Sequence, residues 1–241
     1  MIYKQTIETP SYLCDVDDRL HTWATVRLCQ EVTEYHGNMT GIGFKTLMAK
    51  NQAWVITRAL YNVFRLPNAF EIVELSTWSR GNNGLIAFRD YRMETPDGET
   101  LLTGTSYWTL IDMSARHVIR LGDVVDGYEN HDILATGKSE LQKIKLPDMS
   151  QADCTMERPV AFAMLDHTRH VNNSEYIRLV FDMLHHEGFS TDKQFVLELN
   201  YQLETHEGET LTAVCKQVAN NYYFRIDNQR GISVVARVQT A

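Results

Sequence analysis

The same order of elements, a strand, a helix and then four strands, occurs twice along this chain of 241 residues. Apolar residues that alternate with polar ones predict the strands, and short polar turns separate them. In the first half the strands are predicted over residues 2–14, 53–64, 71–79, 85–93 and 101–111. In the second half the four strands after the helix are predicted over residues 194–203, 210–218, 222–226 and 232–238. This repeat favours two similar units over one irregular domain.

One helix precedes the four-strand run in each half. The second-half helix is predicted over residues 173–187, ended by Gly188, with an apolar face of Tyr176, Ile177, Val180, Phe181 and Leu184. Asn172, with Glu175 three residues later, can form a capping box at its start. The first-half helix is predicted over residues 23–36, ended by Gly37, with an apolar side of Leu28, Cys29, Val32 and Tyr35.

One helix covering a curved antiparallel sheet is the hotdog arrangement, so the predicted fold class is α+β with two tandem hotdog domains. We expect a first domain over residues 1–121, a linker over 122–154 and a second domain over 155–241 that carries the catalytic residues. Two such sheets can pair edge to edge, which closes one exposed edge on each. Asp17 and His21 stand before the first helix much as Asp166 and His170 stand before the second, an offset of 149 residues.

Composition narrows the class of protein. A chain with 44% hydrophobic and 22% charged residues is typical of a folded globular protein. No apolar run approaches the roughly 20 residues of a membrane helix, and the first residues lack the apolar core of a signal peptide. We therefore expect a cytoplasmic protein. The net charge of −8 disfavours nucleic acid as a partner, and no pair of the four cysteines has metal or redox spacing.

The segment that carries the chemistry is residues 165–176. It places Asp166 and His170 just before the second helix, whose free backbone N–H groups favour developing negative charge. A thioester carbonyl placed there would have an oxyanion site ready. For an isolated Asp-x-x-x-His pattern, a plain turn before a helix is the more common interpretation.

The same segment resembles the Asp-x-Asn-x-His-Val-Asn-Asn-x-x-Tyr motif of plant and bacterial acyl-[acyl carrier protein] thioesterases, which are double-hotdog enzymes. The likeness extends over nearly the whole chain. Trp-Val-Ile-Thr-Arg at 54–58 resembles the family's Trp-Val-Val-Thr-Arg strand, and residues 77–84, 98–101 and 106–108 continue the resemblance. Leu-Asn-Tyr-Gln-Leu-Glu-Thr at 199–205 resembles the family's Leu-Glu-Tyr-Arg-Arg-Glu-Cys.

By this resemblance Asp166, His170 and Glu204 match the family's catalytic residues. Thr168 stands where the family usually has Asn and is assigned an orienting role in the same set. Thr205 stands where many members have Cys, which argues against a cysteine nucleophile at that position. Asn172 and Asn173 are candidates for substrate binding, with helix capping as the alternative role of Asn172.

The resemblance implies hydrolysis of fatty acyl-[acyl carrier protein] by a water molecule, assisted by Glu204 and His170. Asp166 would orient the set, and backbone N–H groups would stabilise the oxyanion. The expected partner is an acyl carrier protein, with no cofactor, no metal and no nucleic acid, while dimerisation stays open. Two alternatives remain from the sequence: an acyl-CoA thioesterase on the same fold, and a non-catalytic module that only binds acyl thioesters.

Overall fold

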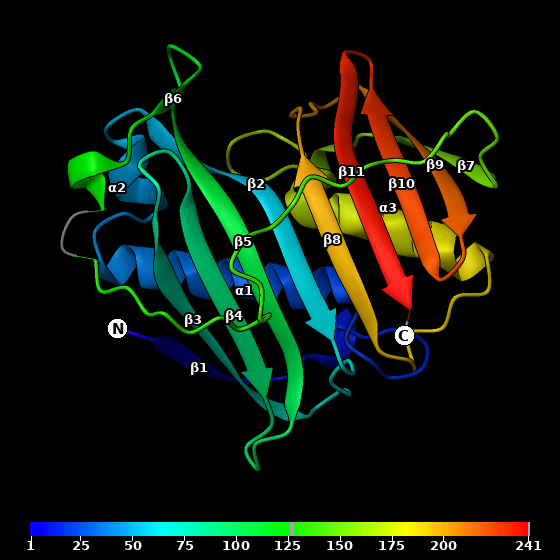
Figure 1. Cartoon of the computed structure of the whole chain (residues 1–241), viewed down its shortest axis with the longest axis horizontal. Coiled ribbons are helices and arrows are strands. Elements are labelled where there is room, and N and C mark those ends of the chain that lie inside the picture. Colours follow the sequence, from blue (N-terminus) through cyan, green and yellow to red (C-terminus); the bar gives the residue numbers. More distant parts are fainter. Residues whose placement is uncertain (126–127, 241) are drawn as a thin grey trace.

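One antiparallel sheet of eleven strands organises the chain in the computed structural model, which describes residues 1–125 and 128–240 (Figure 1). The strands are β1 (Tyr3–Glu8), β2 (Gln52–Val63), β3 (Ile72–Asn82), β4 (Ala87–Glu94), β5 (Thr100–Asp112), β6 (His117–Ile119), β7 (Cys154–Pro159), β8 (Phe195–Tyr201), β9 (Thr210–Val218), β10 (Asn221–Asn228) and β11 (Gly231–Thr240). The helices are α1 (Thr22–Met39), α2 (Phe44–Met48) and α3 (Asn173–His186), with 3₁₀ turns at Ser11–Leu13, Gly122–Val124 and Phe162–Met164. Among them, no helix is long and apolar enough to cross a membrane.

The strand order divides the sheet into two halves of the same topology. It runs β1-β3-β4-β5-β2 through the first half and continues β8-β11-β10-β9-β7 through the second. The halves join where β2 pairs with β8, from Arg58 opposite Asn200 to Val63 opposite Phe195. The fold is therefore the expected pair of tandem hotdog units, and their edge-to-edge pairing is confirmed.

The two halves correspond at an offset of 151 residues, so the offset of 149 inferred from Asp17 and His21 was wrong. Helix α1 begins at Thr22 and α3 at Asn173, and the short bridge Cys14–Leu20 has its counterpart in Leu165–Val171. At this offset the first-half counterparts of Asp166 and His170 are Asp15 and Arg19. The match of Asp17 and His21 with Asp166 and His170 failed because an Asp-x-x-x-His spacing occurs in both loops at different positions.

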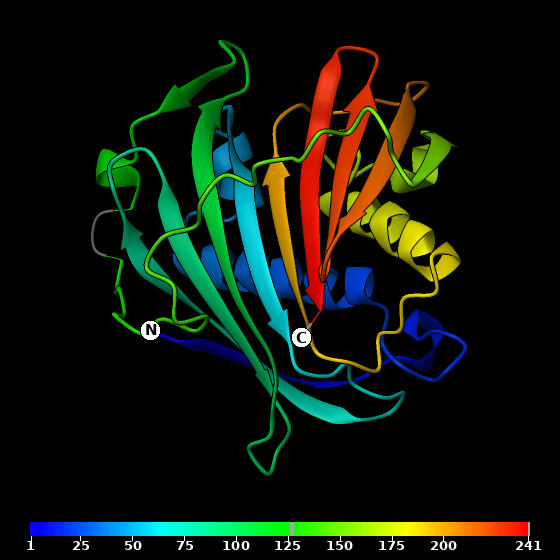
Figure 2. The same cartoon turned by 45° about the vertical axis from the view of Figure 1, so that its right-hand side comes forward.

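Helices α1 and α3 lie side by side against one face of the sheet (Figures 1 and 2). The main core lies between these helices and the sheet. The apolar stripe of α3 is buried as predicted, with Phe181 half-buried at its margin. On α1 the buried side chains include Val26, Cys29 and Val32, whereas Tyr35 is exposed. Burial of these stripes is the main source of stability for helices of this length.

The segment between the halves crosses the opposite face of the sheet (Figure 2). Leu141 packs on Leu60 and Tyr107, and its amide donates a hydrogen bond to the Tyr107 hydroxyl at 2.8 Å. Further along, the amide of Ile144 donates to Asn200 Oδ1 at 2.7 Å. The segment thus covers the sheet across the junction of the two halves. The domain boundaries inferred from the sequence stay a prediction.

Several sequence-based boundaries differ from the structure for local reasons. The first strand ends at Glu8 because the chain then turns through Pro10 into a 3₁₀ segment. Helix α1 continues past Gly37, which does not cap it: a Cβ on Gly37 would lie 3.3 Å from Gly43 Cα, so glycine permits this close approach. The short elements α2 and β6 were not predicted, and the strand expected before the second helix, β7, was not located, because each is brief and depends on neighbours distant in sequence.

A buried histidine of α1 makes stability depend on pH. His36 is 1% exposed, and Arg89 Nη1 lies 3.0 Å from its Nδ1. Burial first, and then Arg89, the Met1 amino group and His131, lower the pKa of His36 from 6.5 to about 4. As the pH decreases, His36 is therefore protonated near pH 6.5 in the unfolded chain but only near pH 4 in the folded chain. The unfolded state binds more protons within this window, so folding stability falls as the pH decreases through it.

We expect the His36→Gln variant to lose less stability on acidification, because glutamine can accept the Arg89 hydrogen bond without titrating. Between pH 7.5 and pH 5 the wild-type protein should lose about 2 kcal/mol more than the variant. Denaturant unfolding at both pH values measures this difference. His185→Gln, which alters an exposed imidazole, should retain the wild-type slope. Equal slopes for wild type and His36→Gln would contradict the assignment.

Candidate active site

A tight loop before α3 positions the predicted aspartate and histidine. The Asp166 amide donates to the His170 carbonyl at 2.9 Å, and Asp166 Oδ1 accepts from the Thr168 amide at 2.8 Å. Arg169 adopts the left-handed region with φ 64°, which lets the chain reverse direction within the loop. The short bridge between Leu165 and Val171 closes the loop, so His170 is held directly before the helix.

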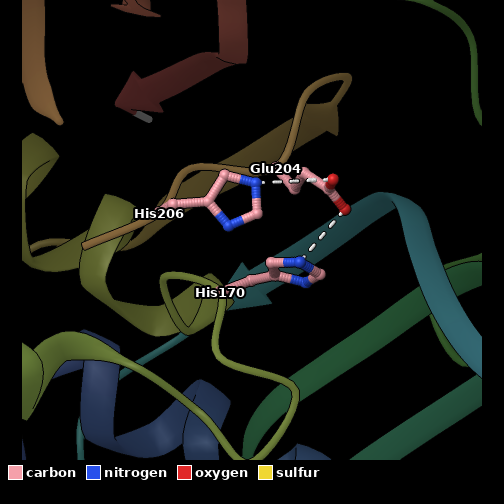
Figure 3. Close-up of side chains that lie close together, drawn as sticks. All are labelled: His170, Glu204 and His206. Carbon is pink, nitrogen blue, oxygen red and sulfur yellow. Dashed lines mark ion pairs between the residues drawn. The ribbon is translucent and has the colours of Figure 1, made fainter. Parts of the chain in front are cut away.

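Glu204 reaches this loop from the segment after β8. The Val171 amide donates to the Thr205 carbonyl at 2.9 Å, which ties the two segments together. Thr205 is fully buried, and its hydroxyl accepts a hydrogen bond from Tyr176 at 2.9 Å. The backbone beside Glu204 is thereby fixed, and Glu204 Oε2 lies 3.3 Å from His170 Nε2 (Figure 3). The structure brings together the predicted Asp166, Thr168, His170 and Glu204.

The hydrogen bonds of Thr168 favour one tautomer of His170. Thr168 Oγ1 lies 2.6 Å from Asp166 Oδ1, and a carboxylate accepts, so the hydroxyl proton points at Asp166. The same Oγ1 lies 3.2 Å from His170 Nδ1 and is free to accept its Nδ1–H. In that tautomer the neutral ring presents a lone pair at Nε2 towards Glu204. Both groups are placed to accept a proton from one water molecule.

The charge state of His170 supports this arrangement. Burial is the largest influence and lowers the pKa of His170 below its ordinary value of 6.5, while the Glu204 carboxylate opposes the decrease. His206 and Arg116 lower the pKa further, and Asp166 raises it. The net decrease leaves the imidazole neutral at neutral pH, as a proton acceptor requires.

Three groups around Glu204 were missed by the sequence analysis. His206 Nε2 lies 3.6 Å from Glu204 Oε1, and Arg116 Nη1 lies 2.8 Å from the same oxygen. Arg230 donates to the Glu204 carbonyl. His206 stands two residues after Glu204, so their proximity could have been suspected. Arg116 comes from the turn after β5, 88 residues away, and has no local signal in the sequence.

The start of α3 offers a backbone donor. Asn172 is the N-cap, and its Oδ1 accepts from the Ser174 amide at 3.0 Å. The predicted capping box was wrong in its second part, because Glu175 is buried and pairs with Arg27 and Arg178 at 3.6 and 3.4 Å. The Asn173 amide makes no hydrogen bond within the described residues, so it remains available to an oxyanion.

A cavity of about 540 Å³ opens beside these groups. His170, Glu204, Asn172 and Asn173 line it, together with residues of α1, α2 and the first-half strands. Its apolar wall includes Ile56, Trp108, Ile111 and Met113. His167 is exposed and packs on Phe44 of α2, with ring centroids 3.8 Å apart. The site therefore lies between the halves: the second supplies the chemical groups and the first supplies most of the cavity.

Two family models match the chain in succession. The one described as the acyl-ACP thioesterase N-terminal domain matches residues 1–128. The one described as the acyl-ACP thioesterase C-terminal domain matches residues 148–238.

Curated relatives are similar at low identity. An oleoyl-acyl carrier protein thioesterase of Arabidopsis thaliana, named as chloroplastic, is 27% identical over 228 residues, covering 88% of this chain and 62% of the relative. A dodecanoyl-[acyl-carrier-protein] hydrolase of Umbellularia californica, also named as chloroplastic, is 26% identical over 227 residues, covering 89% of this chain and 59% of the relative. The chain thus spans about three fifths of the length of these relatives.

Solved structures share the whole fold. The 12:0-ACP thioesterase from Umbellularia californica has a TM-score of 0.88 at 21% identity, covering 100% of this chain and 97% of that one. An acyl-ACP thioesterase from Bacteroides thetaiotaomicron has a TM-score of 0.85 at 20% identity, covering 100% and 98%. At these identities the likeness establishes the fold.

Proposed function

Because this chain belongs to the acyl-[acyl carrier protein] thioesterase family, we propose that it hydrolyses fatty acyl-[acyl carrier protein] to a free fatty acid and the carrier protein. The observation that carries the proposal is the contact between His170 Nε2 and Glu204 Oε2, 3.3 Å long, at a cavity of about 540 Å³. A cavity of this size, with an apolar wall and a few polar groups at one end, suits an acyl chain with a reactive head.

In the proposed reaction a water molecule attacks the thioester carbon, and Glu204, with His170 beside it, accepts a proton from that water. Positioned general-base assistance of this kind contributes about 10²–10⁴-fold in rate. The C–S bond then breaks, and the thiolate of the carrier's prosthetic arm leaves and takes up the proton. No covalent enzyme intermediate is required. This agrees with the residue beside Glu204, which is a buried threonine, Thr205, and not a cysteine nucleophile.

Two further elements complete the proposed mechanism. The Asn173 amide at the start of α3 donates to the oxyanion, where the helix dipole adds to the stabilisation. Asp166 acts through Thr168, which fixes the tautomer and the orientation of His170. Asn172 holds the helix start through its cap and lines the cavity beside the reacting group.

The proposed partner is an acyl carrier protein, itself acidic, so a basic surface near the site would favour docking. Among the arginines, Arg169 lies in the 165–171 loop and is exposed. Others are engaged elsewhere, for example Arg65 with Glu71 and Glu99. Arg116 and Arg230, which contact Glu204, add positive charge near the site.

The choice of carrier is tested by steady-state kinetics on matched acyl-carrier and acyl-CoA substrates with the same acyl chains. The proposal expects a higher kcat/KM for the acyl-carrier substrates. A higher value for acyl-CoA would assign the chain to that substrate class instead. A cytoplasmic location is part of the proposal and is supported by four cysteines that are all free thiols.

We expect Thr168→Val to reduce kcat/KM about 10–100-fold, the usual cost of losing a group that orients a functional histidine. Valine preserves the shape but removes both hydrogen bonds of the hydroxyl, so the His170 tautomer is no longer fixed. Thr168→Ser keeps the hydroxyl and should retain most of the activity. Kinetics on one acyl-carrier substrate compare the pair, and equal activity of the valine and serine variants would remove Thr168 from the mechanism.

A further inference from the structure

Two imidazoles and one carboxylate converge at the site, which is more than the proposed hydrolysis uses. His170 Nε2 lies 3.3 Å from Glu204 Oε2, and His206 Nε2 lies 3.6 Å from Glu204 Oε1 (Figure 3). One ligand atom from each of the three side chains lies within 4.8 Å of the others. In Figure 3 both rings turn an edge towards the same carboxylate.

These separations match the edges of a small tetrahedral metal site. Zinc binds histidine nitrogen at about 2.0–2.1 Å and carboxylate oxygen at about 2.0–2.2 Å, which places tetrahedral ligand atoms about 3.3–3.5 Å apart. The contact of Glu204 Oε2 with His170 falls in this range, whereas His206 lies nearer the other oxygen, Oε1, at a slightly longer distance. A tetrahedral site with one carboxylate oxygen therefore requires the half-exposed His206 ring to turn towards Oε2.

The groups behind His170 and Glu204 suit a zinc site. Zinc-bound histidines usually donate their other ring nitrogen to a hydrogen-bond acceptor, which aims the metal-binding lone pair. His170 has this arrangement, because its Nδ1–H donates to Thr168, which in turn is held by Asp166. Arg116 contacts Glu204 Oε1 and leaves Oε2, the oxygen nearer His170, available to a cation.

We propose that His170, Glu204 and His206 form a binding site for a divalent cation that prefers nitrogen and oxygen ligands, represented by Zn²⁺, and that its binding inhibits the enzyme. The inhibitory part rests on the proposed function. A bound cation takes the lone pairs of His170 and Glu204 that would otherwise accept the proton of the attacking water. Hydrolysis by the general-base route and occupation by the metal therefore exclude each other.

Isothermal titration calorimetry of the metal-free full chain with Zn²⁺ tests the site without reference to activity. We expect one tight site, with an affinity at least ten times weaker in His206→Gln and in Glu204→Gln. His185→Gln, which removes an exposed imidazole at the end of α3, should bind as the wild type does. Circular dichroism of each metal-free variant verifies that it is folded. No tight site, or an unchanged affinity in His206→Gln, would overturn the proposal.

Released fatty acid, measured by chromatography because thiol reagents also bind zinc, tests the inhibition. Zn²⁺ should lower the wild-type rate, and a chelator should restore it. The rate of each protein is compared with its own metal-free value. Half-inhibition of His206→Gln should require at least ten times more Zn²⁺ than half-inhibition of the wild type. A rate that Zn²⁺ leaves unchanged or raises would overturn the inhibitory role. If the chain hydrolyses no acyl thioester, the proposed function fails while the calorimetric result still decides the metal site.

Discussion

Glu204→Gln is expected to lower kcat for acyl-carrier hydrolysis by about 10²–10⁴-fold, the contribution of a positioned general base. Glutamine has nearly the same shape as glutamate but cannot accept the proton of the attacking water. Its neutral side chain also removes the charge that faces His170 Nε2 at 3.3 Å. KM should change much less than kcat, because the cavity proposed to hold the acyl chain is lined mainly by first-half residues.

Glu207→Gln is the matched control. Glu207 lies in the same turn before β9 and is exposed, so this variant should keep wild-type kinetics. Initial rates of wild type, Glu204→Gln and Glu207→Gln on one substrate make the comparison. Near wild-type turnover by a folded Glu204→Gln protein would reject the role of Glu204.

Gly104→Val is expected to destabilise the fold by about 3 kcal/mol or more, the usual scale of a severe steric conflict in a packed core. Gly104 of β5 pairs with Tyr61 of β2 on one side and Tyr91 of β4 on the other. A Cβ there would lie 2.7 Å from Tyr61 Cδ1 and 3.2 Å from Tyr91 Cδ2. Both rings are 1% exposed and cannot move aside without disturbing the core.

Thermal unfolding measures this effect, and a loss of about 3 kcal/mol corresponds to a decrease in Tm of about 6–12 °C for a chain of this size. Gly98→Ala is a useful comparison because no atom lies within 4 Å of the added Cβ, although its φ of +91° disfavours alanine. Its cost should stay near 1–2 kcal/mol. A Gly104→Val protein no less stable than Gly98→Ala would contradict the steric account.

Local patterns were sufficient for much of the fold. The helical spacing of apolar residues before Gly188 predicted α3 almost to the residue. Alternation of polar and apolar residues located β9 with its observed bounds, Thr210–Val218. Features that depend on tertiary contacts were missed: α1 continues past Gly37, where the absence of a Cβ permits the close approach of Gly43, and no local pattern reports that contact. The true repeat offset appears in the structure, in the helix starts, the short bridges and the matched loop geometry around Asp15 and Asp166.

The candidate site could be predicted where a short motif carries it. Asp166, Thr168 and His170 lie in one loop, and Glu204 followed from its spacing to His170 in the resembling family. The electrostatic surroundings could not be predicted, since Arg116 reaches Glu204 from a turn 88 residues away. The cavity was also beyond local patterns, because first-half and second-half residues line it together.

Release of free thiol from a panel of acyl carrier proteins, loaded with fatty chains of different lengths, tests the central claim most directly. With purified wild-type protein, the account predicts multiple turnovers on at least one chain length, with fatty acid and free carrier formed in equal amounts. Tight binding of the acylated carriers without any release of thiol or fatty acid would contradict it.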